Sequence, residues 1–499
     1  MKQGLELQQI IYDILLNQIE SGIYRYMDNL PTIETVSAQF HVSVDTARAA
    51  YGRLKREGYI SLLRNAGAKV IVRRDEREIT RHIQIFFSLR KEALMDLGKS
   101  FLPLFGRAQW LGLKHASPET LDRLNPFSQT KREEQAPYAV WEFLKRKYTA
   151  LGNDLLLRLV WQIYMFFYAP FFSVEGNIRY LEGRERYERE AFLVCRQKDW
   201  MALQSLITRF HESLFTAMYR FYEEKITMQT PKQKIPFCWD SYRKPSQRCY
   251  SLAVELLASI SRGEYPAECF LPSAKQLSAE KGVSVSTVRR AVGLLGSIGA
   301  VKSSRTLGAR VLPFERSTEN CDFTQPILQR RLLDMAESLQ LFALSCRSVS
   351  ELTLSSLPPD SIRQLQQELR MVVNRQQYEL LNYIVLEQLA KFAPYRAVRT
   401  VYSELLRQLF WGRSIHGMKG DQKTINKMYG PYLDDLLKCL EPLDVSQFSA
   451  KLEELTTYEL LETVRNLSRL EIPGAEKLLV PDTDTDEYIP FSGIYATDY

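Results

Sequence analysis

Two segments of the sequence carry the same order of hydroxyl and guanidinium side chains. They are Ser43, Thr46 and Arg48 in the first segment, and Ser284, Thr287 and Arg289 in the second. Hydroxyl groups donate hydrogen bonds to phosphate oxygens, and an arginine can donate two hydrogen bonds to the major-groove edge of guanine. The chemistry open to these residues is therefore the recognition of double-stranded DNA.

Helical spacing predicts which side of each segment is buried. Because serine is a favoured N-cap, we expect helices to begin after Ser43 and Ser284. The apolar positions that predict the buried faces are Ala47, Ala50, Tyr51 and Leu54 in the first helix, and Val288, Ala291, Val292 and Leu295 in the second. The opposite faces present Asp45, Arg48, Gly52 and Arg53, and Ser286, Arg289, Arg290 and Gly293.

Further helices are predicted just before each of these two. Thr32 is expected to cap a short helix in the first segment, while Ser273 followed by Gln276 forms a capping-box pattern in the second. An amphipathic run that ends at Gly22 predicts a supporting helix upstream, since glycine favours helix ends. Two helices joined by so short a turn predict a helix-turn-helix.

A β-hairpin is predicted after each helix-turn-helix. In the first segment, residues 59–62 and 69–72 resemble two short strands joined by a turn through Arg64 and Gly67. Arg305 and Gly308 occupy the corresponding turn of the second segment. Such a hairpin forms the wing of a winged helix-turn-helix head.

The two heads are predicted to be copies of one unit. Gly22 and Pro31 recur as Gly263 and Pro272, 241 positions later, and no gap is needed across the heads. The same shift carries Pro118 onto Pro359, so the repeated unit extends into the helical region that follows. A constant offset of this length favours internal duplication.

The ordered motifs of each copy resemble the heads of the GntR family of transcription regulators. The resemblance implies that the third helix reads bases, that the second contacts phosphate, and that the wing tip contacts the backbone or minor groove. By position, these roles fall on Ser43, Thr46, Arg48, Arg64 and Gly67 in the first copy, and on Lys275, Ser284, Thr287, Arg289, Arg305 and Gly308 in the second. Val44 and Val285 stand where the family commonly has arginine, so each head lacks one contact.

The two heads differ in charge at the predicted DNA surface. Where the family is usually basic, the second copy has Lys275 and the first has Glu34, and Asp45 adds another carboxylate to the first. Residues 5–75 hold nine basic and eight acidic side chains, a net charge of +1, whereas residues 246–314 hold nine and four, a net charge of +5. Because neutralised phosphates supply most non-specific affinity, we expect the second copy to bind DNA more strongly. The first copy is either weakened or reads a cytosine through Asp45.

The regions between and after the heads are predicted to be helical. The first resembles the FCD effector domain that follows GntR heads in fatty-acid-regulator-type proteins. That family holds a metal on one Asp and three His, but the matching positions fall near Val140, Leu144, Glu188 and Phe210 or His211, so we expect neither a metal nor a cofactor. Aromatic residues at helical spacing are typical of a core, but they could instead line a pocket for a small-molecule effector: Trp141, Trp161, Tyr164 and Tyr168, and Tyr378, Tyr383, Tyr395, Tyr402 and Phe410.

The expected fold class is mainly α. Two winged helix-turn-helix domains, each with a small β wing, alternate with two all-helical domains in a pseudo-two-fold duplicated arrangement. The expected boundaries are residues 1–75 and 246–314 for the heads, 77–235 and 318–480 for the effector-like helical domains, and 481–499 for an acidic tail.

Composition and pattern exclude several other classes of protein. The seven scattered cysteines include no C-x-x-C pair, which indicates reduced thiols rather than a disulfide or zinc framework. The sequence does not begin with a signal-peptide pattern, and its most apolar run, residues 159–172, is shorter than the ~20 residues that cross a bilayer. We therefore expect a cytoplasmic protein whose partners do not include a membrane.

The sequence contains no glycine-rich phosphate loop, nucleophile elbow or zinc-protease motif, so we expect no catalytic residues and no enzyme. We predict a sequence-specific DNA-binding regulator, a repressor by resemblance. Because one chain holds two heads, we expect a monomeric pseudo-dimer on an asymmetric or imperfect palindromic operator, or a homodimer. The rival hypothesis is a degenerate regulator that acts as a protein-protein interaction module, with one or both heads not binding DNA.

Overall fold

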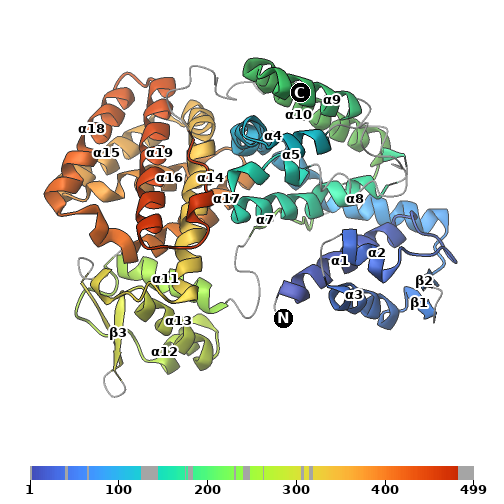
Figure 1. Ribbon diagram of the computed structural model, residues 1–499, viewed down its shortest axis with the longest axis horizontal. Coiled ribbons are helices and arrows are strands. Elements are labelled where there is room, and N and C mark those ends of the chain that lie inside the picture. Colours follow the sequence, from blue (N-terminus) through green and yellow to red (C-terminus); the bar gives the residue numbers. More distant parts are fainter. Residues whose placement is uncertain are drawn as a thin grey trace. The chain divides into compact units, whose positions relative to one another are not determined.

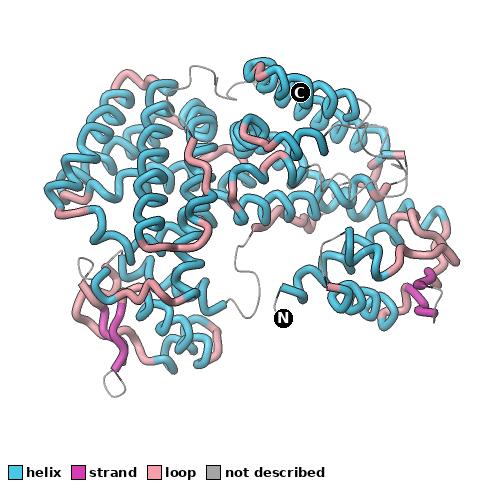
Figure 2. The backbone as a smooth tube through the Cα atoms, in the orientation of Figure 1, coloured by secondary structure: helices cyan, strands magenta, loops and turns pink. Residues whose placement is uncertain are grey.

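Helices dominate the fold, and the strands among the described residues form two short antiparallel hairpins (Figure 1, Figure 2). The chain divides into two compact units, of which the first contains residues 1–101, 112–150 and 157–237, and the second contains residues 102–111, 151–156 and 238–499. The computed structural model describes residues 3–39, 43–63, 67–124, 144–174, 176–177, 184–229, 232–239, 248–261, 263–304, 308–313 and 318–481.

The first head consists of three helices and a hairpin. Its supporting helix ends just before Gly22, whose φ of +79° is a left-handed conformation that favours glycine. The wing begins its second strand at Gly67, two positions earlier than predicted. The elements are α1 (Gln3–Glu20), α2 (Ile33–Gln39), α3 (Val44–Arg56), β1 (Ile60–Leu63) and β2 (Gly67–Val70).

The second head repeats the first at the offset of 241 positions. The third helix and both strands match end to end, and the hairpins share one register, with Ile60 opposite Val70 and Val301 opposite Val311. The elements are α11 (Arg248–Ser261), α12 (Ala274–Lys281), α13 (Val285–Ser297), β3 (Val301–Ser304) and β4 (Gly308–Val311). The predicted duplication of a winged helix-turn-helix is therefore confirmed.

The helical region after the first head opens with a long helix, α4. The apolar run predicted at residues 159–172 belongs to a longer helical stretch, Asp154–Phe172, whose first turn adds three leucines after Asp154. This stretch has 19 residues and a mean hydropathy of 1.4, enough to cross a membrane, but 67% of it is buried inside the protein. The elements are α4 (Glu76–Lys114), α5 (Pro118–Leu124), η3 (Thr149–Leu151), α7 (Asp154–Ile163), the π-helical η4 (Tyr164–Tyr168), α8 (Ala169–Phe172), α9 (Arg184–Gln197) and α10 (Trp200–Lys225).

The helical region after the second head repeats this order in part. Helix α15 begins at Pro359, as the offset from Pro118 predicts. Asp199 and Asp444 each cap the long helix that ends its repeat, α10 and α19. The elements are η8 (Thr318–Asn320), α14 (Pro326–Ser356), α15 (Pro359–Arg375), η9 (Tyr378–Leu380), α16 (Leu381–Phe392), α17 (Arg396–Leu409), η10 (Phe410–Lys419), α18 (Gln422–Leu440), α19 (Val445–Arg469) and η11 (Ala475–Lys477).

The two heads differ in where their hydrophobic cores end. The core of the first head consists of head residues, and α3 buries the four side chains that its spacing predicts. The core of the second head continues into the following helical region, through Leu332 of α14 and Trp411 of η10. The predicted buried face of α13 therefore needs a correction. Leu294, a member of this extended core, is buried, and Val292 is half-buried.

Two pieces from the first half of the sequence complete the second unit, namely residues 102–111 of α4 and residues 151–156. The buried Asn153 amide donates hydrogen bonds to the Glu337 carbonyl at 2.8 Å and to Gln340 Oε1 at 2.7 Å. A Cβ atom on Gly152 would lie 1.9 Å from the Lys477 carbonyl oxygen, so this contact requires glycine. The division into two heads and two helical domains stays a prediction, and the second unit includes residues from both halves.

Candidate DNA-binding surfaces

The exposed face of α13 carries two arginines, Arg289 and Arg290. Neither guanidinium forms a hydrogen bond or an ion pair with any residue that the structure describes. Val288 and Ala291 on the opposite face are fully buried in the head, so the helix is held with both arginines toward solvent. This arrangement leaves two cations available to an anionic partner.

A cluster of hydroxyl groups marks the start of α13. Ser284 Oγ accepts a hydrogen bond from the Thr287 N–H at 3.2 Å, which makes Ser284 the N-cap that the sequence predicts. The Ser284 hydroxyl also lies 2.9 Å from that of Ser286 and 2.8 Å from that of Thr287. Because the N-terminus of a helix carries partial positive charge, these hydroxyls are well placed for a phosphate.

The second helix of this head presents a further cation. Ser273 and Gln276 form the predicted capping box, since the Gln276 N–H donates to Ser273 Oγ at 3.3 Å and the Ser273 N–H donates to Gln276 Oε1 at 2.9 Å. Lys275 lies in the first turn of α12 and is exposed, without a hydrogen-bond or ion-pair partner in the described part of the chain. The position that the resemblance assigns to phosphate contact is thus open to solvent.

The corresponding cation of the first head is paired. On α3, the Arg48 guanidinium lies 2.5 Å from the Asp45 carboxylate, one helical turn away. Both side chains are largely exposed, at 58% and 88%. An exposed pair of this kind contributes little to stability, so its main effect is on the charge that the helix presents to a partner.

The predicted DNA-reading face of the first head needs a correction at Arg53. Its guanidinium lies 2.8 Å from the Glu57 carboxylate, stacks 3.8 Å from the Tyr12 ring centroid and donates a hydrogen bond to Gln9. A hydrogen bond from Tyr12 and the pairing with Arg53 together lower the pKa of Glu57. Arg53 therefore ties α3 to α1 and is not available to DNA as the sequence predicts.

The remaining predicted contacts of the first head lie on α2 and the wing. Thr32 caps α2, accepting a hydrogen bond from the Thr35 N–H at 3.1 Å. Glu34 is exposed in the first turn of that helix, where the second head has Lys275. Gly67 and Gly308 begin the second strand of each wing, while Arg64 and Arg305 lie outside the described residues.

One surface residue near the second wing was not singled out from the sequence. Phe270 is 48% exposed, pairs with Arg310 in an isolated β-bridge, and stands close to Gly308. An aromatic residue directly before Leu271-Pro272 was the available signal, but aromatic residues are common in cores, and the sequence does not place this one at the surface.

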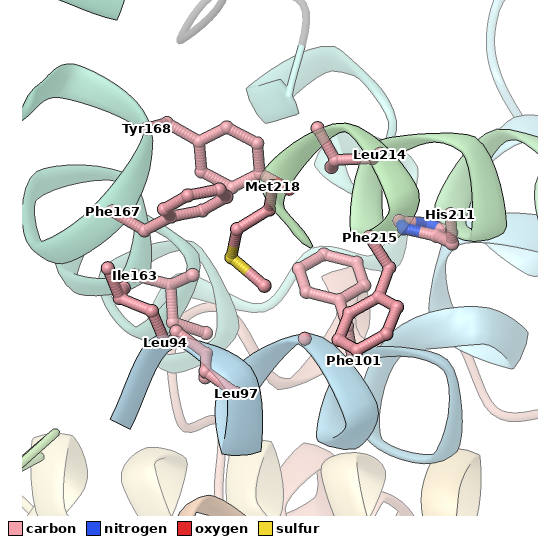
Figure 3. A pocket seen from close by; sticks show the side chains of 11 residues that line it. Leu94, Leu97, Phe101, Ile163, Phe167, Tyr168, His211, Leu214, Phe215 and Met218 are labelled. Atoms are coloured by element: carbon pink, nitrogen blue, oxygen red, sulfur yellow. The ribbon is translucent and has the colours of Figure 1, made fainter. Parts of the chain in front are cut away.

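The aromatic residues singled out in the helical regions are divided between the core and half-buried positions, and the half-buried ones are Trp161, Tyr378, Tyr383, Tyr395 and Phe410. Tyr164, Tyr168 and Tyr402 are buried, and Trp141 lies outside the described residues. Figure 3 shows the cavity that Tyr168, Phe101 and His211 line in the first unit. Its volume of about 20 Å³ has room for roughly one water molecule, and therefore not for an effector.

The positions matched to the FCD metal site do not gather metal ligands. Leu144 is a buried apolar residue, Val140 lies outside the described residues, and Glu188 and His211 are buried. Among the residues that the structure describes, no group of three or more His, Cys, Asp or Glu side chains is arranged to hold a metal ion.

Comparison with known proteins places both heads in one family. Residues 7–70 and residues 251–311 each match the family described as bacterial regulatory proteins, gntR family. The search of curated protein sequences finds no match.

Several solved structures also resemble parts of the chain. GntR from Streptococcus agalactiae is 16% identical, with a TM-score of 0.21, and the match covers 43% of this chain and 99% of that one. A structure described as Lar, which controls expression of the Listeria monocytogenes agr system, is 15% identical, with a TM-score of 0.23, over 45% of this chain and 99% of that one. A GntR family member from Pseudomonas syringae pv. tomato is 14% identical, with a TM-score of 0.20, and the match covers 46% of this chain and 91% of that one.

Both family matches fall on the segments that fold as winged helix-turn-helix heads, and the third helix and both strands have the same bounds in the two copies after the shift of 241 positions. This chain therefore carries two winged helix-turn-helix domains that match the gntR family of bacterial regulatory proteins, one in each copy of an internal duplication.

Proposed function

We propose that this chain is a cytoplasmic, sequence-specific transcription repressor whose second head supplies most of its affinity for DNA. The observation that carries the proposal is the difference between Arg289, which has no ion-pair partner among the described residues, and Arg48, which is paired with Asp45. DNA binding gains counterion-release free energy for each phosphate that a cation neutralises, so the unpaired cations favour the second head.

The residues proposed to contact DNA follow from their position in the heads, and for Arg64 and Arg305 from position alone. In the second head they are Ser273, Lys275, Ser284, Ser286, Thr287, Arg289, Arg290, Arg305 and Gly308. In the first head they are Thr32, Ser43, Asp45, Thr46, Arg48, Arg64 and Gly67.

The two heads are proposed to act as a pseudo-dimer within one chain. Residues 102–111 and 151–156, from the first half of the sequence, are built into the core of the second unit, which supports folding of both halves as one protein. Because Glu34 and Asp45 replace Lys275 and Ser286, the preferred operator is an asymmetric or imperfect palindrome. The helical regions are proposed to bind a small-molecule effector that changes DNA affinity.

Selection of duplexes from a random pool by the full chain tests this function. We expect an enriched motif with one strong and one weak half-site. We also expect binding that weakens steeply with salt. The Lys275→Glu variant, which copies Glu34 of the first head, should lower affinity and the salt dependence, whereas Lys427→Glu on the exposed face of α18 makes the same charge change without either effect. Failure to enrich any motif would contradict the proposal.

A second candidate function concerns the first head alone. Tyr26, Met27 and Ile71 are 41%, 50% and 44% exposed beside its wing, and the backbone N–H of Met27 bonds to the carbonyl of Val70. The equivalent of Ile71 in the second head is Leu312, which is buried. An exposed apolar group on a head whose Arg48 and Arg53 are already paired favours a protein partner for this head. Loss of these side chains would then leave DNA affinity unchanged but abolish capture of that partner.

A further inference from the structure

A groove runs along the second head where it meets the helical region of the same unit. It lies between α11 of the head and the pair α16–α17, and its volume is about 520 Å³. This size is typical of small-molecule sites. Small and aliphatic side chains that are buried form its apolar floor: Val254, Ala258, Ala390 and Leu406.

Charged side chains also line the groove. Glu387 and Lys391 are four residues apart on α16, the spacing at which a glutamate and a lysine normally pair. They do not pair in this structure, and Lys391 has no hydrogen-bond or ion-pair partner among the described residues. Arg407 of α17 also lines the groove, and its guanidinium lies 3.6 Å from Glu404.

An aromatic pair and a second carboxylate complete the lining of the groove. The rings of Tyr383 and Phe410 contact each other at a tilt of 56°, with their centroids 5.5 Å apart, and the Tyr383 hydroxyl donates a hydrogen bond to Glu387 at 3.3 Å. Glu255 of α11 also lines the groove but is paired with Lys281 at 2.8 Å. The groove therefore offers an apolar surface, one carboxylate without an ion-pair partner among the described residues, and two cations.

We infer that this groove binds a free amino acid with an apolar side chain. The ligand's ammonium group is held by Glu387, its carboxylate by Lys391 and Arg407, and its side chain lies on the buried floor beside Tyr383 and Phe410. An uncharged ligand would leave Glu387 and Lys391 without an ionic partner. A simple acid or amine would satisfy one sign of charge and leave the other unmatched.

The position of the groove gives the ligand a regulatory role, and this part of the inference rests on the proposed function. Helix α11 packs against α13, which carries Arg289, while α16 and α17 belong to the helical region. A ligand in the groove therefore contacts both the DNA-binding head and its neighbouring helices. Amino-acid binding is thus expected to change the DNA affinity of the second head.

Calorimetric titration of the full chain with L-phenylalanine and L-leucine tests binding without any DNA. We expect saturable binding of at least one of the two. We also expect at least tenfold weaker binding of 3-phenylpropanoate and phenethylamine, which each lack one charge. If neither amino acid binds, or if phenethylamine binds as well as L-phenylalanine, the inference is wrong, whatever the chain does with DNA.

Three variants locate the binding. Ser403→Trp, at an exposed position of the groove, should abolish binding without disturbing the core. Glu387→Gln should weaken L-phenylalanine at least tenfold and leave the weak affinity for 3-phenylpropanoate unchanged, because the acid does not use that carboxylate. Glu441→Gln, on an exposed residue outside the groove, is the matched control. Unchanged binding in both Ser403→Trp and Glu387→Gln would overturn the inference, while a folded control confirms that the readout is sound.

Discussion

The Arg48 guanidinium and the Asp45 carboxylate lie 2.5 Å apart on the exposed face of α3, whereas at the equivalent positions of α13 Arg289 stands one turn from Ser286. The change from serine to aspartate is therefore one of the differences between two helices that have equivalent bounds and a serine N-cap each, and it is the one that pairs the arginine. The pair makes the first head less attractive to phosphate in two ways, because it occupies the arginine and adds a negative charge.

Replacement of Asp45 by serine should strengthen DNA binding by the full chain. The substitution frees Arg48 and removes one repulsive charge, so we expect a gain of about 1 kcal/mol, roughly fivefold in affinity at low salt. Fluorescence anisotropy with the selected operator measures the change. Asp122→Ser, on the exposed α5, removes the same charge far from α3 and should have little effect. Equal gains in both variants would show that net charge alone controls affinity.

The second head should depend on its helical neighbours for stability. Arg413 of η10 donates a buried hydrogen bond to the Leu312 carbonyl at 2.9 Å, just after the wing of that head. Arg413→Ala leaves this carbonyl without its donor and should cost about 1–3 kcal/mol. Hydrogen exchange should accelerate in β4 while β2 of the first head is unchanged.

The matched control for this variant is Arg465→Ala. Arg465 is 56% exposed and pairs with Glu462 on the same helix, so its loss should be nearly neutral. If Arg413→Ala accelerates hydrogen exchange in the wings of both heads, the claim that only the second head depends on this contact is wrong.

Acid should destabilise the first unit through His211. Burial, assisted by the charge of Lys147, holds the pKa of His211 well below its usual range. The unfolded chain therefore binds a proton that the folded chain does not. The contribution of neutral His211 to the free energy of unfolding is fully present above the unfolded pKa of about 6.5. As the pH decreases below that value, this contribution is lost at about 1.4 kcal/mol per pH unit.

Urea unfolding at several pH values, followed by hydrogen exchange in α10, measures this slope. The His211→Gln variant should lose it, although the variant is less stable overall because His211 stacks on Phe101. His115→Gln, at the end of α4, should keep most of it, since His115 is less buried than His211. If the pH dependence of the free energy of unfolding is unchanged in His211→Gln, other titratable groups cause it and the prediction is wrong.

Local patterns predicted the heads well. The buried face of α3 and the serine caps depend on residues within a few positions of one another, so periodicity and capping chemistry identify them from the sequence. The duplication gave a second, independent reading of the same pattern, and the matching bounds of α3 and α13 reflect it.

Long-range packing accounts for what the sequence did not predict. Arg53 contacts Tyr12 and Gln9, more than forty positions upstream, and periodicity on α3 carries no sign of that. Leu294 is buried because the core of its head extends to Trp411, and the groove beside α11 exists only once distant helices are brought together. The contrast between the heads in charge was visible in the sequence, but the pairing of Arg48 was not.

The most direct test of unequal heads is the affinity of full-chain Arg289→Ala and Arg48→Ala for the selected operator, measured at one salt concentration. Loss of an arginine that contacts a base or phosphate costs about 1–3 kcal/mol, so Arg289→Ala should weaken binding roughly tenfold or more. Because Arg48 is already paired with Asp45, Arg48→Ala should change affinity by less than about threefold. Equal losses in the two variants, or a larger loss with Arg48→Ala, would contradict the account.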